Sequence, residues 1–140
     1  EDEIARKTDE LLERIGLSAE RDTLVKSLPL GWKQKLAFSV SIFHHPRIVF
    51  LDEPTGGVDP ATRRQFWELI YQAADRGITV FVTTHFMDEA EYCDRIMIQD
   101  QGKMLILGTP EEVRNRGGKN LTMNEAFIAI VENSRRKEEL

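Results

Sequence analysis

Apolar positions recur at helical spacing through the first third of the chain. In the first segment the apolar positions 4, 11, 12 and 15 fall at helical spacing and Gly16 follows them, which predicts a helix that ends at a glycine cap. In a later segment Leu36, Val40 and Phe43 share one stripe, which predicts another helix, and Pro46 ends it. The helices predicted in this part cover residues 4–15, 18–22 and 32–44.

Two runs of β-branched and aromatic residues, 47–52 and 78–82, show no alternation of apolar and polar positions. Such runs are typical of strands that are buried on both faces of a parallel sheet. Between them, Asp59 followed by Pro60 predicts the start of a helix, with Asp59 as the N-cap and Pro60 in the first turn. This helix is expected to end near Gly77.

The last third of the chain continues with short elements. The segment 100–103, Asp-Gln-Gly-Lys, is typical of a hairpin turn. Thr122 with Glu125 three residues later predicts a capping box at the start of the final helix, which we expect to fray within the charged tail 132–140. The other elements predicted here are a helix over 87–92, strands over 95–99 and 104–107, and a short helix after 109–110.

Composition excludes several classes of protein. The chain has 140 residues, 19 of them basic and 24 acidic, and a net charge of −5. This acidic balance argues against a protein that coats nucleic acid, so we expect no nucleic-acid partner. The longest apolar run, 126–131, is far shorter than the roughly 20 residues of a membrane span, and no signal peptide is expected. The single cysteine, Cys93, fits a reducing compartment, which favours a cytosolic globular protein.

Acidic and imidazole side chains follow the two predicted strands. Asp52 and Glu53 end the first strand, and His85 follows the second. An α/β sheet binds ligands at the carboxyl ends of its parallel strands, which meet at one edge. A magnesium ion with a nucleotide phosphate would offset the charge of Asp52, and Glu53 would orient or deprotonate a water. His85 suits contact with a γ-phosphate or with that water. An isolated Asp-Glu pair is more often a solvated strand end, but the apolar run before it favours a site.

Several segments together resemble one known family. Residues 48–55, Ile-Val-Phe-Leu-Asp-Glu-Pro-Thr, look like the Walker B strand of ABC transporter ATPases, residues 56–60 resemble the D-loop, and residues 84–85 resemble the switch histidine. Segments 87–91 and 108–112 are also similar to that family. The resemblance covers essentially the whole chain. It is strongest to ATP-binding subunits that pair with drug- or antibiotic-type export permeases.

The resemblance implies the fold class: α/β, a partial P-loop NTPase (ABC ATPase) fold. It implies a mostly parallel sheet with a helical subdomain, a C-terminal hairpin and C-terminal helices. Residues 1–45 would be the helical subdomain segment that carries a degenerate signature. Residues 46–140 would form the α/β core with its Walker B strand, D-loop and switch histidine, followed by the C-terminal helices.

The resemblance also implies a role for each matching residue. Asp52 would hold Mg²⁺ through water, Glu53 would be the catalytic carboxylate, and His85 would contact the γ-phosphate of ATP. Asp59 would communicate across a head-to-tail dimer with a second ATP-binding subunit. The other implied partner is a transmembrane permease, which would place the protein in the cytoplasm, on the inner face of the cell membrane.

Residues 28–34 stand where the ABC signature, Leu-Ser-Gly-Gly-Gln, belongs, and they depart from it. Leu28 and Gly31 match, but Pro29 replaces the serine whose hydroxyl binds the γ-phosphate held by the opposite subunit. Backbone amides near Gly31 could still favour an anion, so Gly31 is a candidate nucleotide-binding residue and Lys33 a weaker one. The alternative, an ordinary loop before a helix, stays open.

No segment matches the phosphate-binding loop G-x-x-x-x-G-K-[ST], and no Q-loop candidate is present. We expect both elements to precede residue 1, which would make the chain the C-terminal part of an ATP-binding subunit. Such a part should bind Mg-ATP weakly or not at all. It should also leave an exposed sheet edge or apolar face that promotes self-association.

Two other functions stay open. A non-transport ABC ATPase acting on DNA repair or ribosomes would be supported by coiled-coil insertions or strongly basic segments, and the sequence contains neither. A catalytically silent interaction module would agree with the degenerate signature. The presence of both Glu53 and His85 argues against a silent module.

Overall fold

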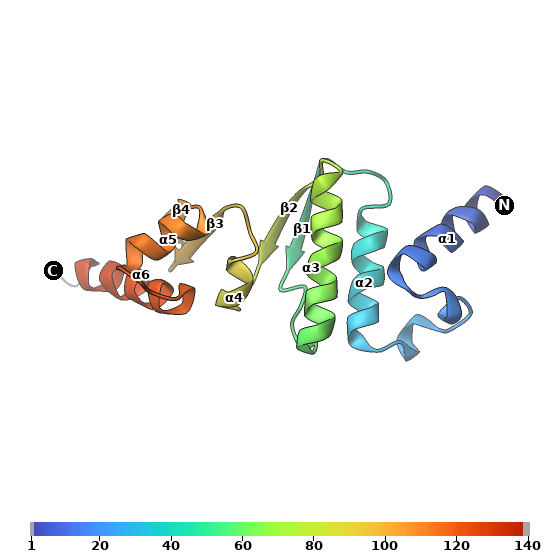
Figure 1. Cartoon of the computed structure of the whole chain (residues 1–140), viewed down its shortest axis with the longest axis horizontal. Coiled ribbons are helices and arrows are strands. Elements are labelled where there is room, and N and C mark those ends of the chain that lie inside the picture. The colour runs from blue at the N-terminus through green and yellow to red at the C-terminus, as the bar shows by residue number, and fades with distance from the viewer. Residues whose placement is uncertain (1, 139–140) are drawn as a thin grey trace. The chain divides into compact units, whose positions relative to one another are not determined.

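The secondary structure falls into two units, residues 1–83 and 84–140, of which this computed structural model describes residues 2–138 (Figure 1). The first unit contains α1 (Asp2–Ile15), two 3₁₀ turns (Ser18–Glu20 and Val25–Ser27), α2 (Leu30–Ser41), β1 (Ile48–Asp52), α3 (Pro60–Asp75) and β2 (Thr79–Thr83). The second contains α4 (Met87–Ala90), β3 (Ile96–Asp100), β4 (Lys103–Gly108), α5 (Pro110–Gly117) and α6 (Met123–Glu138). The predicted boundary after residue 45 stays a prediction.

No helix within 2–138 has both the length and the apolar character needed to cross a bilayer.

The elements of the first unit lie in a row. α1 packs against α2, α2 against α3, and α3 against β2 (Figure 1). The rings of Phe38 on α2 and Phe66 on α3 are 5.4 Å apart and tilted by 50°, so an aromatic contact joins the two helices. The core of this unit consists of the buried apolar residues Ile15, Leu17, Leu28, Phe38, Ile42, Val49, Phe66, Trp67, Ile70, Ala73 and Ile78.

The predicted end of the first helix is confirmed. The Leu17 N–H donates to the carbonyl of Leu12 at 2.8 Å, and the Gly16 N–H donates to that of Glu13 at 3.1 Å. These two bonds form a Schellman cap around Gly16. The next predicted helix, 18–22, is shorter than expected and forms a single 3₁₀ turn.

Helix α2 begins two residues earlier and ends three residues earlier than predicted. The apolar stripe that suggested the helix is not its buried face, because Val40 is 55% exposed. The residues of α2 that are buried are Gly31, Lys35, Phe38 and Ser39. Gly31 allows the close approach of Thr62 on α3, and the Phe38 ring contacts the ring of Phe66 on the same helix.

Strands β1 and β2 form a two-stranded parallel sheet in which Val49 pairs with Val80 and Asp52 pairs with Thr83. Both strands lie where they were predicted, but the prediction that they are buried on both faces is wrong. One face is covered, and the other exposes Phe50 (69%) and Phe81 (43%), whose rings are 5.6 Å apart. The sheet of the first unit is therefore parallel but small. The expected exposed apolar face is confirmed.

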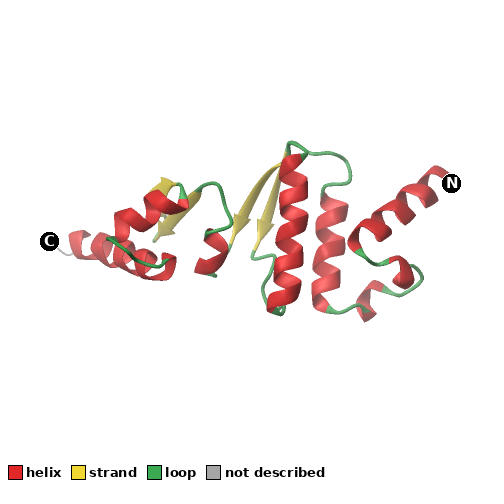
Figure 2. Cartoon of the chain, in the orientation of Figure 1, coloured by secondary structure: helices red, strands yellow, loops and turns green. Residues whose placement is uncertain are grey.

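The second unit is built on an antiparallel hairpin covered by helices (Figure 2). Its turn is the one predicted, because Gln101 and Gly102 have φ angles of 48° and 76°, the left-handed pair that a tight hairpin needs. α5 and α6 pack together, and α6 also contacts β4 and α4. The core consists of Ala90, Ile98, Val113, Met123, Ile130 and Val131.

Helix α6 starts with the predicted capping box. The Glu125 N–H donates to the Thr122 hydroxyl at 3.3 Å, and the Thr122 N–H donates to the Glu125 carboxylate at 2.8 Å. We expected the helix to fray within the charged tail 132–140. It continues to Glu138, and residues 139–140 lie outside the described part of the chain. Near this end of the helix, Arg135 forms a bidentate ion pair with Asp100. Its Nε and Nη2 atoms lie 2.9 and 3.0 Å from the two carboxylate oxygens, so the pair connects the charged end of α6 to the hairpin.

Candidate functional site

Asp52 stands at the carboxyl end of β1, and a threonine on the neighbouring strand orients it. Thr83, its partner in the parallel register, donates its hydroxyl to Asp52 Oδ1. The Glu53 N–H donates to the Thr83 carbonyl at 3.0 Å and lies 3.2 Å from the Thr83 hydroxyl oxygen. Thr83 thus contacts both acidic residues. Both acids are exposed at the surface of the first unit.

Glu53 has a left-handed backbone, with a φ of 44°. For a residue with a side chain this conformation costs about 1 kcal/mol or more. Contacts on both sides stabilise it: the bond to Thr83 precedes the turn, and the Gly56 N–H donates back to the Glu53 carbonyl at 3.1 Å. Thr55, only 1% exposed, anchors the turn in the protein. A strained acidic residue at the end of a strand is a feature of functional sites.

Asp59 caps α3 as predicted. Its Oδ1 accepts the N–H groups of Ala61 and Thr62, both at 3.0 Å, and its Oδ2 accepts the Thr62 hydroxyl at 2.5 Å. These bonds favour the charged carboxylate, and the bond from the Thr62 side chain is the largest cause that lowers the pKa of Asp59. The role of Asp59 across a dimer stays a prediction.

Gly31 lies in the first turn of α2 and is buried. A β-carbon there would overlap the Cγ2 methyl of Thr62, so the close approach of α2 and α3 requires glycine. The next turn of α2 contacts the loop that precedes α3, since Gln34 Nε2 donates to the Gly56 carbonyl at 3.2 Å. Lys33 donates instead to the Lys26 carbonyl at 2.9 Å. The structure gives Gly31 a packing role, and its contact with a nucleotide stays a prediction.

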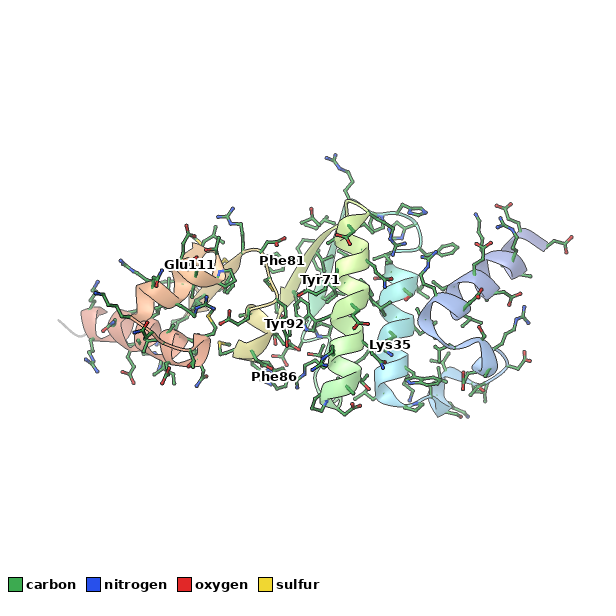
Figure 3. All side chains as sticks on the ribbon, in the orientation of Figure 1. Lys35, Tyr71, Phe81, Phe86, Tyr92 and Glu111 are labelled. Carbon is green, nitrogen blue, oxygen red and sulfur yellow. The ribbon has the colours of Figure 1, made fainter. Side chains whose placement is uncertain are left out.

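Lys35 is a buried cation that the sequence did not reveal. It lies on the side of α2 that faces α3 and donates to the Gln65 amide oxygen (Figure 3). Burial lowers the pKa of Lys35, and the charges of Asp59 and Glu68 act against that shift. Apolar periodicity could not identify this lysine, because a lysine in a helix is normally counted with the solvent-exposed face.

His85 belongs to the second unit, where it is exposed and stacks on Phe86 with ring centroids 4.2 Å apart. Thr84 fixes the chain around it, because its hydroxyl accepts the Phe86 N–H at 3.0 Å and donates to the Glu89 carboxylate at 2.6 Å. Glu89 is fully buried, at 0% exposure. The sequence analysis did not identify Glu89 as the residue that anchors this segment. An acidic residue in a short helix is normally expected at the surface, so nothing in the sequence marked it as buried.

The first unit therefore holds two groupings of candidate residues. One joins Asp52 and Glu53 through Thr83, and the other joins Gly31 to Asp59 through Thr62. Within residues 2–138, no three His, Cys, Asp or Glu side chains gather as a set of metal ligands. A single oriented carboxylate still fits Mg²⁺, which proteins often bind through one or two carboxylates together with substrate phosphates.

Comparison with known proteins identifies similar sequences. The family model described as "AAA domain, putative AbiEii toxin, Type IV TA system" matches residues 4–86. The probable multidrug ABC transporter ATP-binding protein YbhF of Escherichia coli is 46% identical over 129 residues, which are 89% of this chain and 22% of that protein. The linearmycin resistance ATP-binding protein LnrL of Bacillus subtilis is 34% identical over 137 residues, 92% of this chain and 44% of that protein. The chain thus spans less than half the length of either relative.

A solved structure is similar as well. CbiO1 of Clostridium perfringens, described as part of the ABC transporter complex cbiONQ, matches with a TM-score of 0.70 and 32% identity. The match covers 80% of this chain and 45% of CbiO1. The arrangement of helices and strands described above is therefore a partial version of the fold of an ABC transporter subunit.

Proposed function

We propose that this chain, which belongs to the AAA domain family and is part of an ABC transporter ATP-binding subunit, contributes the acidic residues that hydrolyse ATP in that subunit. The observation that carries the proposal is the end of β1. There Thr83 orients Asp52 and bonds to the backbone of Glu53, which holds a strained conformation. Strain compensated by such bonds is expected where a side chain must be held for chemistry.

Each acid has a separate task. Asp52 would hold Mg²⁺ through water, and the bound ion supplies charge neutralisation for the phosphates of ATP. Glu53 would orient the attacking water and accept its proton as the water oxygen bonds to the γ-phosphorus and ADP leaves. His85 would hydrogen-bond the γ-phosphate through its imidazole, on a segment that Thr84 and Glu89 hold in place.

The other site residues would contact a second ATP-binding subunit. Asp59 and the amides near Gly31 would face the nucleotide of that subunit in a head-to-tail dimer, with ATP bound between the two. Hydrolysis would drive a transmembrane permease from the cytoplasmic face of the membrane. Drug export is the transport favoured, because the two similar proteins described above are named for multidrug transport and for linearmycin resistance.

Replacing one carboxylate oxygen of Glu53 with an amide nitrogen tests whether this residue is the catalytic carboxylate. In the complete ATP-binding subunit, Glu53→Gln should lower ATP hydrolysis by about 100-fold or more, because the amide cannot accept the proton of the water. The variant should retain bound ATP after free nucleotide is removed. Turnover is measured by phosphate release and retention by filtration with labelled ATP.

The matched control is Glu13→Gln, which makes the same change on the exposed face of α1. It should hydrolyse ATP at the normal rate. If Glu53→Gln hydrolysed ATP as fast as this control, Glu53 would have no catalytic role, and the proposal that the chain supplies the catalytic carboxylate would be wrong.

A further inference from the structure

Thr62, in the first turn of α3, contacts two residues that the proposed function assigns to the dimer. Its hydroxyl donates to Asp59 Oδ2 at 2.5 Å. Its Cγ2 methyl occupies the space in which a β-carbon of Gly31 would lie. No motif marked Thr62 in the sequence, yet it touches both the loop 56–59 and the start of α2.

Two more contacts join the same pair of elements. Gln34 Nε2 donates to the Gly56 carbonyl at 3.2 Å. The Cδ2 atom of Leu30 lies 3.2 Å from the position that a β-carbon of Gly57 would take. Together with Thr62, these contacts connect the first turns of α2 to the loop 56–59 at three points.

The side chain of Thr62 couples its two contacts through one torsion. A β-branched residue is stiff at χ1, and in a helix few rotamers are open to it. The rotamer that directs the hydroxyl to Asp59 is the one that directs the methyl to Gly31. Displacing the methyl would therefore turn the hydroxyl away from the carboxylate.

We propose that Thr62 is a positioning residue that fastens Asp59 to the Gly31 turn of α2, so that both meet the second ATP-binding subunit as one rigid surface. The inference rests on the proposed function, which places both elements against that subunit. Preorganisation of this kind strengthens association, because less side-chain and loop freedom is lost on binding. Thr62 itself need not touch nucleotide.

The test uses the complete subunit carrying Glu53→Gln, in which ATP is not consumed. Thr62→Val keeps the shape of the side chain and removes the hydroxyl. We expect ATP-dependent dimerisation to weaken about tenfold, the size of one hydrogen bond to a charged group, while ATP affinity of the monomer is unchanged. Thr62→Ser keeps the hydroxyl and should recover most of the dimer. Dimers are measured by light scattering and monomer binding by calorimetry.

A second pair of variants tests the methyl contact. Gly31→Ala should weaken the dimer, because its β-carbon displaces the Thr62 methyl. Adding Thr62→Ser should restore it, since the nearest remaining atoms, Thr62 Cβ and Oγ1, are 3.4 and 3.6 Å from the new β-carbon, an ordinary contact. Such a recovery is non-additive and identifies a direct contact.

The control is Thr8→Val, which also removes a hydroxyl, one that donates to the Ile4 carbonyl on exposed α1. It should dimerise as the parent does. Equal dimerisation of Thr62→Val and Thr8→Val, or no recovery of Gly31→Ala by Thr62→Ser, would overturn the inference and leave the proposed function intact. A Glu53→Gln parent that neither retains ATP nor dimerises would overturn the proposed function and the inference with it.

Discussion

At the scale of single residues, two threonines organise the candidate site. Thr83 holds Asp52 and the backbone of Glu53, and Thr62 holds Asp59 against the start of α2. In both cases a neutral hydroxyl helps to orient a carboxylate at the surface. The candidate acids Asp52 and Glu53 were evident from their place after a strand, whereas the threonine that contacts them was not.

Thr83→Val should weaken the binding of Mg²⁺ that supports ATP hydrolysis. The valine keeps the β-branched shape but removes the hydroxyl that orients Asp52. Loss of a group that orients a metal ligand typically costs 10- to 100-fold in metal affinity or activity. In the complete subunit, the Mg²⁺ concentration that supports half-maximal ATP hydrolysis should rise by about tenfold, measured by titration at saturating ATP.

Thr79→Val is the control for this prediction, because Thr79 lies at the other end of β2, opposite Ile48. It should leave the Mg²⁺ dependence unchanged. A Thr83→Val subunit with the same Mg²⁺ dependence as this control would show that Asp52 does not depend on the hydroxyl.

At the scale of elements, local motifs in the sequence predicted where helices and turns begin, whereas the buried face of a helix depended on tertiary packing. The N-cap of α3, the hairpin turn and the capping box of α6 all form as predicted, because each depends on residues at most three apart. The buried face of α2 was not predictable from apolar spacing, since Phe38 is its single large apolar residue and a lysine and two small residues make up the rest. Helix α6 continues through its charged tail to Glu138, where Arg135 pairs with Asp100, 35 residues away, a contact that local spacing could not indicate.

Removing the cap of α6 should destabilise the second unit. Thr122→Ala loses the bond from the Glu125 N–H, and such a substitution costs about 1 kcal/mol. The expected result is a lower midpoint in urea unfolding with an unchanged slope, followed by circular dichroism. Thr122→Ser keeps the hydroxyl and should unfold close to the wild type. A midpoint for Thr122→Ala equal to that of Thr122→Ser would contradict the assignment of the cap.

At the scale of the whole chain, the sheet of the first unit has one covered face and one apolar exposed face. Phe50 and Phe81 form an aromatic pair on the exposed face, with Ile48 beside them at 45% exposure. An exposed cluster of this kind favours association. Burial alternates along β1 and β2, and α3 packs against β2 within the first unit. The apolar run of the sequence did not indicate this alternation.

We therefore expect the 140-residue chain to self-associate in solution and Phe50→Lys to reduce that association. The lysine adds charge at a side chain that is 69% exposed, so the fold should tolerate it. Light scattering over a range of concentrations measures the effect. Leu24→Lys, at a site that is 64% exposed and outside the sheet, is the control. A wild-type chain that stays monomeric at every concentration would contradict this prediction.

The same 140 residues should bind Mg-ATP only in the millimolar range or more weakly, about 4 kcal/mol or less. None of the glycines starts a phosphate-binding loop, and that loop normally provides the amides and lysine that hold the phosphates. Calorimetric titration of the chain measures the affinity. A micromolar dissociation constant would mean that other residues bind the phosphates.

The sequence by itself determined the order of the elements, the caps and turns, and the positions of Asp52, Glu53 and His85 after their strands. Those features depend on interactions between near neighbours along the chain, so a single sequence contains them. The tertiary structure alone decided which face of each strand is covered and which residues hold the acids. Thr83 meets Asp52 across 31 positions, and Thr62 meets Gly31 across the interface of two helices. Contacts of this kind exist only once the elements have packed, because packing brings together residues that the sequence separates.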